Sequence, residues 1–191
     1  VLYDGDQYEV QRVVEDRYTP YVELKATATQ NYTQAIHDKR IRQLEVEKSY
    51  DLGDGYQLCA GMGTVHIDYS AYNVINMHSG EIVEPLVPIE LDPITPRTQL
   101  MWISFPPRII DRVMDEIPAD SMLQPPDDTA FTPMGEQEYT LAGGLHGGEH
   151  GMIKMTPLEL RLDNSDMGGL STLEHPELGM PVWFIHDAVE G

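Results

Sequence analysis

Two histidines and one glutamate in the sequence are spaced so that they could bind a metal ion together. His146 and His150 are four residues apart, and Glu149 lies between them. Residues four apart share one face of a helix, so both imidazoles could hold one Zn²⁺ ion while the carboxylate acts as a general base. A third ligand would be needed, and the sequence offers Glu159, His175 and Asp187 for that place.

The H-x-x-E-H spacing matches inverted zinc peptidases, so a zinc-dependent hydrolase is one alternative. Five glycines surround the motif between positions 143 and 151, and each costs a helix about 1 kcal/mol relative to alanine. We therefore favour a structural interpretation, in which the three side chains hydrogen-bond loops packed on a glycine flank of the helix. Positioning of partner domains without a metal is a further alternative. We expect no catalytic residue and no bound metal here.

Two other sites near the C-terminus could also do chemistry. The stretch Asp166-Met167-Gly168-Gly169 has the composition of an anion-binding loop, but the lysine of a phosphate-binding loop is missing. His186 and Asp187 could act as an acid–base pair or as a pair of ligands, although such a pair more often caps the turn that follows a strand. The sequence contains no Walker motif, no dinucleotide-binding fingerprint, no nucleophilic serine elbow and no CxxC pair.

A basic cluster in the first part of the chain is a candidate nucleic-acid interface. Lys39, Arg40 and Arg42 could hold a phosphate backbone, and Tyr32 could stack on a base. Residues 1–48 carry seven basic and nine acidic groups, whereas the rest of the chain carries five and 23. If any part of the chain touches nucleic acid, we expect it to be this one. The alternative is a solvated strand edge with packing tyrosines.

The overall charge limits the other partners of the chain. There are 32 acidic and 12 basic residues, for a net charge of −20, which opposes nonspecific binding to nucleic acid or anionic lipid. The protein either avoids polyanions or has the acidic, lysine-poor surface typical of a high-salt cytoplasm. We favour the second explanation, because the acidic groups are spread along the chain.

The single cysteine and the absence of long apolar runs also bound the interpretation. Cys59 excludes an internal disulfide, fits a reducing, cytoplasmic compartment and excludes a multi-cysteine zinc site within this chain. No apolar run approaches 18 residues, so we expect no membrane contact.

Three segments are predicted to position these residues, in an α+β fold. Residues 1–48 alternate as short antiparallel strands, at 8–14 and 21–26 among others, for which a small β-barrel is the simplest closure. Residues 49–105 continue as a β-sheet segment with a proline-rich connector, and the turn at 78–81 predicts a hairpin.

Residues 106–191 are predicted to form a glycine-rich helical domain with a short terminal strand. Apolar residues share one face of a helix over 109–117, which Pro118 ends. A second helix is expected to begin at Thr132-Pro133 and to continue to about Met155, with its glycines forming a flank for tight packing. Residues 182–185 form a buried strand.

An ordered series of residues in the last fifty positions resembles a known family. It is similar to the C-terminal region of DEAD/DEAH-box DNA helicases of the mitomycin-repair type, at the start of their zinc-binding domain. The matching positions are Leu145-His146, Glu149-His150, Pro157-Leu158, Asp166–Thr172, His175-Pro176, Gly179, Pro181 and Asp187. The opening of the chain, Tyr32-Thr33 and Arg97-Thr98 with Trp102 are similar to the segment after the motor domains.

The resemblance implies a 3′→5′, ATP-driven DNA helicase with a role in repair. We expect its ATPase lobes before Val1 and its zinc-binding cysteines after Gly191, so ATP, magnesium and zinc belong to the full-length protein and none to this chain. Three positions depart from the family pattern: Leu162 stands where a cysteine is usual, His186 where a tyrosine is usual, and Ala188 where a glycine is usual.

The expected function is that of an accessory region of the helicase, which docks on the motor domains of the same polypeptide and guides single-stranded DNA. The zinc hydrolase is an alternative, and so is an interaction module without a motor in a defence or repair complex.

Overall fold

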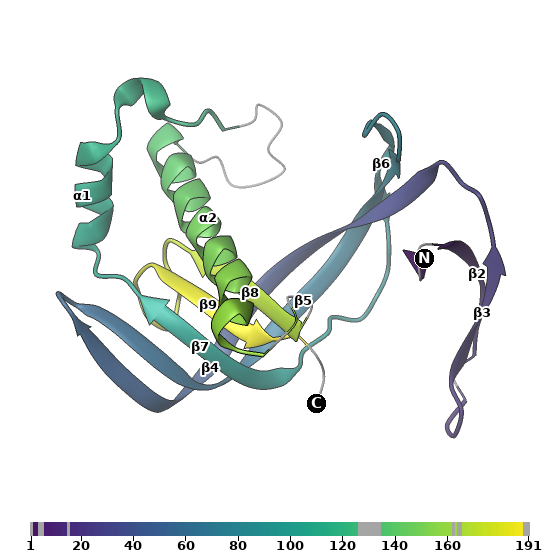
Figure 1. Ribbon diagram of the computed structural model, residues 1–191, viewed down its shortest axis with the longest axis horizontal. Coiled ribbons are helices and arrows are strands. Elements are labelled where there is room, and N and C mark those ends of the chain that lie inside the picture. Colours follow the sequence, from purple (N-terminus) through teal and green to yellow (C-terminus); the bar gives the residue numbers. More distant parts are fainter. Residues whose placement is uncertain are drawn as a thin grey trace. The chain divides into compact units, whose positions relative to one another are not determined.

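The computed structural model describes residues 2–3, 6–14, 16–125, 135–161, 163 and 166–188. They fold as two compact units, which comprise Val1–Asp38 with Asp68–Pro93, and Lys39–Ile67 with Ile94–Gly191. Both contain antiparallel strands, and the second also contains two α-helices (Figure 1). The predicted α+β class is confirmed. The division of the chain into domains at 1–48, 49–105 and 106–191 remains a prediction.

The first unit contains an open sheet of three antiparallel strands, β1 (Leu2–Tyr3), β2 (Asp6–Val14) and β3 (Tyr21–Ala26), in the order β1-β2-β3. Strands β2 and β3 confirm the two predicted from alternation. The closed barrel predicted for residues 1–48 is wrong for the described residues. Its last part belongs to a 23-residue strand, β4 (Asn31–Gly53), which is hydrogen-bonded into a different sheet.

The predicted hairpin at residues 78–81 joins β5 (Tyr56–Asn76) to β6 (Ile82–Pro88). The Asn76 side chain accepts hydrogen bonds from the backbone N–H groups of His78 and Ser79, at 2.9 and 3.1 Å. Gly80 has φ +72°, a conformation that glycine adopts without steric cost. These local contacts explain why the turn could be recognised from its residues.

The second unit is organised by the sheet order β4-β5-β7-β9-β8. Strand β7 (Arg97–Ser104) lies between β5 and β9 (Val182–Asp187), and β8 (Met167–Thr172) pairs with β9 at the end of this order. The two strands predicted at 97–105 and 182–185 are therefore neighbours in the sheet, although about 80 residues separate them.

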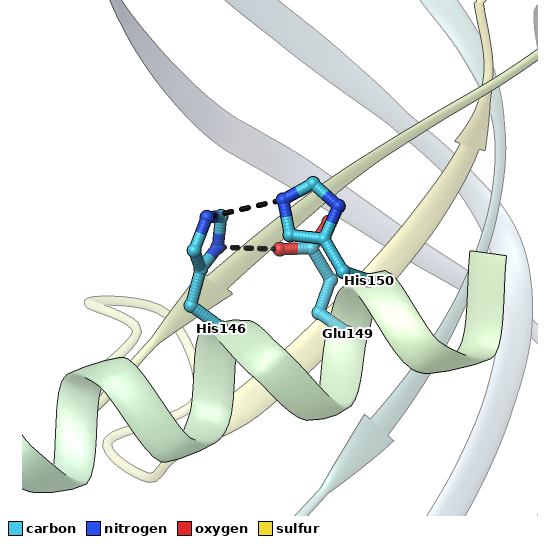
Figure 2. Close-up of side chains that lie close together, drawn as sticks. All are labelled: His146, Glu149 and His150. Carbon is cyan, nitrogen blue, oxygen red and sulfur yellow. Dashed lines mark hydrogen bonds and ion pairs between the residues drawn. The ribbon is translucent and has the colours of Figure 1, made fainter. Parts of the chain in front are cut away.

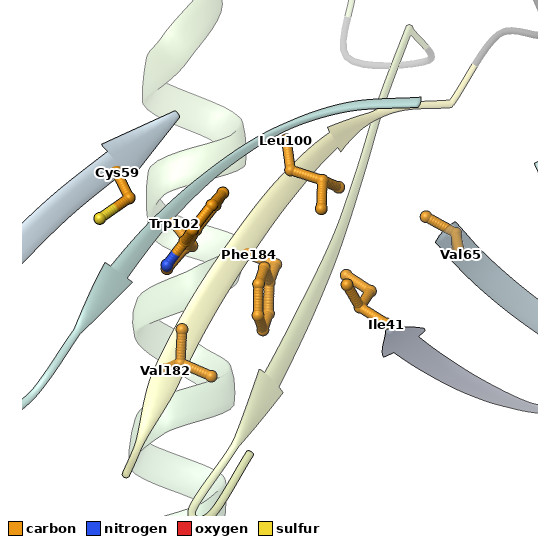
Figure 3. Packing of buried hydrophobic residues seen from close by; sticks show 7 residues of the cluster. All are labelled: Ile41, Cys59, Val65, Leu100, Trp102, Val182 and Phe184. Atoms are coloured by element: carbon orange, nitrogen blue, oxygen red, sulfur yellow. The ribbon is translucent and has the colours of Figure 1, made fainter. Parts of the chain in front are cut away.

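The core of this unit lies on one face of the sheet (Figure 3). Trp102 of β7 and Phe184 of β9 are paired across the strands, with ring centroids 6.0 Å apart. Ile41 from β4 and Val65 from β5 are fully buried against them. Apolar side chains alternate along β7 and β9, which buries one face and leaves the other for the helices.

Two α-helices belong to this unit, α1 (Arg108–Glu116) and α2 (Glu136–Glu159), with the short 3₁₀ turn η1 (Ala119–Ser121) after α1. Helix α2 packs against β8 and β9 (Figure 1). Both helices confirm the sequence prediction. Thr132 and Pro133, the expected start of the second, lie outside the described residues. No helix in the described part of the chain is long and apolar enough to cross a membrane.

Candidate functional site

The three residues of the H-x-x-E-H motif meet on helix α2 (Figure 2). The Nδ1 atom of His146 lies 3.0 Å from Oε2 of Glu149, and its Nε2 atom lies 3.1 Å from Nε2 of His150. The two imidazole rings are nearly perpendicular, with centroids 4.4 Å apart. A carboxylate oxygen only accepts hydrogen bonds, so Nδ1 of His146 carries the proton and Nε2 presents a lone pair to His150.

Glu149 and the histidines differ sharply in their exposure. The Glu149 side chain is 3% exposed and the His146 side chain 61%. A side chain at Gly169 of β8 would collide with the Glu149 carboxylate, so the carboxylate points at the sheet. Glu149 therefore holds His146 in place and is not directed to the solvent side of the two imidazoles, where a general base would be needed.

The glycines of helix α2 do not form one continuous packing flank. A Cβ atom at Gly148 would overlap the Trp183 ring of β9, with Cη2 at 2.7 Å, so this position requires glycine. Among the described residues, nothing lies within 4 Å of a Cβ atom added at Gly144, Gly147 or Gly151. The predicted close packing of a neighbouring element against the helix backbone is therefore found at Gly148. It is not found at Gly144, Gly147 or Gly151.

The loop predicted at Asp166, Gly168 and Gly169 is wrong for the two glycines, which lie in a strand that does not provide an anion-binding turn. Gly168 and Gly169 lie within β8 and pair with His186 and Ile185 of β9, and neither has a positive φ. A nest of amides needs a left-handed residue, which a regular strand lacks. The glycines are required for space: a Cβ atom at Gly168 would overlap the His186 ring, and one at Gly169 would lie 2.6 Å from Ile153.

The structure places His175 and Asp187 outside the histidine cluster. His175 is 1% exposed, and its Nε2 atom lies 2.9 Å from the carbonyl oxygen of Ile41. Burial lowers the pKa of His175, partly offset by this hydrogen bond, so the neutral ring donates to the carbonyl. Asp187 is exposed at the end of β9, and its backbone carbonyl, rather than its carboxylate, bonds Nδ1 of His186.

A hollow of about 580 Å³ brings together three residues that the sequence had singled out separately, Asp166, His186 and Asp187. Its walls include Leu100 and Met101 of β7. Burial lowers the pKa of His186, and within the described part of the chain its Nε2 atom has no hydrogen-bond partner. His186 and Asp187 thus meet through a backbone hydrogen bond beside this hollow, and the Asp187 charge partly offsets the effect of burial on the pKa of His186.

The candidate nucleic-acid residues divide into inward and outward side chains. Lys39 is half-buried, and its Nζ atom donates to the carbonyl oxygen of Gly169 over 3.2 Å. Burial lowers the pKa of Lys39, and the negative charge of Glu149 raises it by a smaller amount. Arg42 is half-buried and donates to the Ile41 carbonyl over 2.8 Å, whereas Arg40 is exposed.

Tyr32 belongs to the first unit, where it is 42% exposed.

Glu177 is an important contact that the sequence did not indicate. Its carboxylate accepts the backbone N–H groups of Gln43 at 2.7 Å and Leu44 at 3.0 Å. Gln43 has φ +56°, so the carboxylate holds a left-handed position within β4. Desolvation opposes ionisation, but the two backbone hydrogen bonds lower the pKa of Glu177. Glutamine is not a residue type that favours a left-handed conformation, so the sequence does not indicate this kink.

No protein-family model and no curated protein matches the chain. The fold is similar to a crystal structure of the DUF1998 helicase MrfA bound to DNA, with a TM-score of 0.55 and 22% identity over 100% of this chain. A structure of the same helicase with DNA and AMPPNP gives a TM-score of 0.46 and 18% identity over 98% of the chain. The chain spans only about a fifth of the helicase, 22% and 19% of its length in the two alignments.

Proposed function

We propose that this chain is an accessory region of an ATP-dependent DNA helicase, which docks on the motor and guides single-stranded DNA during repair. The observation that supports this proposal is the likeness of fold, over the whole chain, to part of a helicase that was crystallised with DNA. The ordered series of residues from Leu145 to Asp187 points to the same group of proteins. A motor-free interaction module is the alternative, and it would not require DNA binding.

The sequence lacks the residue types by which such a helicase is expected to hold its cysteine-bound zinc, its ATP and its magnesium. Its zinc would be held by several cysteines, and the chain has Cys59 alone, which is 6% exposed within the apolar core. ATP and magnesium would need a phosphate-binding loop, and the sequence contains none. In this proposal the chain binds and positions DNA, and the motor performs the chemistry.

Of the three predicted cations Lys39, Arg40 and Arg42, Arg40 is the first candidate to contact a phosphate, because its side chain is exposed whereas Lys39 is turned inward to Gly169. Arg42 keeps one guanidinium nitrogen on the Ile41 carbonyl and is the second candidate. Tyr32 could stack on a base. The net charge of −20 opposes nonspecific binding of nucleic acid, so any binding would have to depend on local contacts of this kind.

Fluorescence anisotropy with a labelled oligothymidine tests the proposal, over a series of salt concentrations. We expect Arg40→Ala to weaken binding several-fold and to reduce the slope of log K against log salt by about 0.7, the value for one phosphate contact on a single strand. Lys154→Ala, which removes one exposed cation from α2, is the matched control and should leave binding unchanged. Equal affinities of wild type and Arg40→Ala would reject this DNA face, and no binding by wild type would favour the interaction module.

The zinc hydrolase is not favoured by the geometry. Its general base would have to be Glu149, which is 3% exposed and bonded to His146 Nδ1. A base in that position cannot reach a water molecule bound on the Nε2 side of the histidines.

A further inference from the structure

The two histidines of helix α2 present their Nε2 atoms to each other at the solvent side of the helix. The separation of 3.1 Å is close to that of two ligand atoms on one ion, since two nitrogens bound at about 2.0–2.1 Å to a tetrahedral ion are roughly 3.3 Å apart. Both histidines are exposed, so an ion could reach them without unfolding of the helix.

Glu149 fixes the orientation that such a site requires. Its carboxylate accepts the Nδ1 proton of His146, which leaves the Nε2 lone pair of that ring toward His150. A carboxylate behind a metal-binding histidine is a common arrangement, because it sets the tautomer and increases the basicity of the ring. Glu149 is itself fixed by burial against Gly169 of β8.

We propose that His146 and His150 form a binding site for one divalent transition-metal ion, with Glu149 as the positioning residue. Imidazole nitrogens suit Zn²⁺, Cu²⁺ and Ni²⁺, and they discriminate against Mg²⁺ and Ca²⁺, which prefer oxygen ligands. The remaining coordination positions face solvent. Without metal, Nε2 of His150 donates its proton to the Nε2 lone pair of His146; to bind the ion, His150 takes the tautomer with its proton on Nδ1, which frees its own Nε2 lone pair. The site is independent of the proposed DNA-guiding function, and it requires no base and no hydrolysis.

Isothermal titration of the 191-residue chain with Zn²⁺ in excess Mg²⁺ tests the proposal. The magnesium occupies carboxylates of the acidic surface, so the remaining zinc binding reports imidazole ligands. We expect one equivalent of zinc in wild type and an affinity at least about ten times lower in His146→Ala and in His150→Ala. His78→Ala is the matched control, because His78 is exposed in the β5–β6 turn, and we expect it to keep wild-type affinity.

Glu149→Gln separates positioning from ligation. We expect it to weaken zinc binding by about 10- to 100-fold while both histidines remain. Since Glu149 is buried, the fold of this variant is checked by circular dichroism. Nitrogen NMR of His146 provides a second measurement without metal: wild type should show the proton on Nδ1. Zinc binding of equal strength in wild type and in the His146→Ala, His150→Ala double variant would overturn the proposal, and so would a His146 proton on Nε2.

Discussion

The Nε2 atom of His175 donates a hydrogen bond to the carbonyl oxygen of Ile41 over 2.9 Å, although the two residues are 134 positions apart. His175 follows β8, and Ile41 lies in β4, so one side chain links segments at opposite ends of the sheet order. The ring of His175 also packs on Phe184 of the core, with centroids 5.0 Å apart. This histidine is therefore a structural part of the second unit.

His175→Ala should lower the free energy of unfolding by about 2–4 kcal/mol. The change removes a buried ring from the core and one of the two side-chain hydrogen bonds that the Ile41 carbonyl accepts, the other coming from Arg42. The lost ring and the lost hydrogen bond each cost on the order of 1–3 kcal/mol. Urea denaturation followed by tryptophan fluorescence would measure it, because Trp102 lies in the same core. His78→Ala should stay within about 0.5 kcal/mol of wild type. A similarly small change in His175→Ala would contradict this structural role.

The stability of the chain should decrease as the pH falls from about 7 toward 5. Burial lowers the pKa of both His175 and His186 below 6.5, so the unfolded chain binds protons in a range where the folded chain does not. Because the unfolded state then holds more protons, the free energy of unfolding rises with pH in this window.

Urea midpoints at closely spaced pH values would measure the slope. His175→Ala should show a shallower slope than wild type, whatever its absolute stability, since one of the two titrating groups is gone. If the two slopes were the same, His175 would not be the source of the pH dependence.

Two adjacent glycines of helix α2 should respond in opposite ways to alanine. Gly147→Ala should raise the stability by up to about 1 kcal/mol, because alanine is the better helix former and, apart from the neighbouring backbone of α2 itself, no described atom lies within 4 Å of the new Cβ. Gly148→Ala should lower it by about 1–3 kcal/mol, because the new methyl group would overlap the Trp183 ring. Thermal unfolding of the pair gives the comparison, and shifts of the same sign would exclude the packing of α2 on β9 described above.

These contacts also explain what the sequence could predict. Helix α1 and strands β2, β7 and β9 were predictable, because their apolar residues alternate with the periods of a helix or a strand. Strand β8 was mistaken for a loop because Gly168 and Gly169 are poor strand formers. Their requirement for glycine comes from His186 and Glu149, which approach from distant parts of the chain.

In the candidate sites, too, local features could be predicted from the sequence and contacts between separate elements could not. The spacing of His146 and His150 is local, so their shared face could be predicted, whereas the burial of Glu149 depends on β8. The inward direction of Lys39 could not be predicted, because Lys39 and Arg40 are both charged and no apolar alternation distinguishes the two faces of β4 there.

Lys39 and Arg40, which are adjacent in β4, should therefore separate stability from DNA binding. Lys39→Met keeps the apolar stem but removes the ammonium group that bonds the Gly169 carbonyl and faces the charge of Glu149. The loss of one hydrogen bond from a charged donor and of a partner for a buried carboxylate should cost about 1–3 kcal/mol. Arg40→Ala should change stability by less than about 0.5 kcal/mol, as is usual at an exposed position.

Urea unfolding and oligothymidine anisotropy would be measured on both variants, under conditions where Lys39→Met is still folded. We expect a stability defect only in Lys39→Met and a binding defect only in Arg40→Ala. The reverse pattern would mean that Lys39 leaves Gly169 to contact DNA.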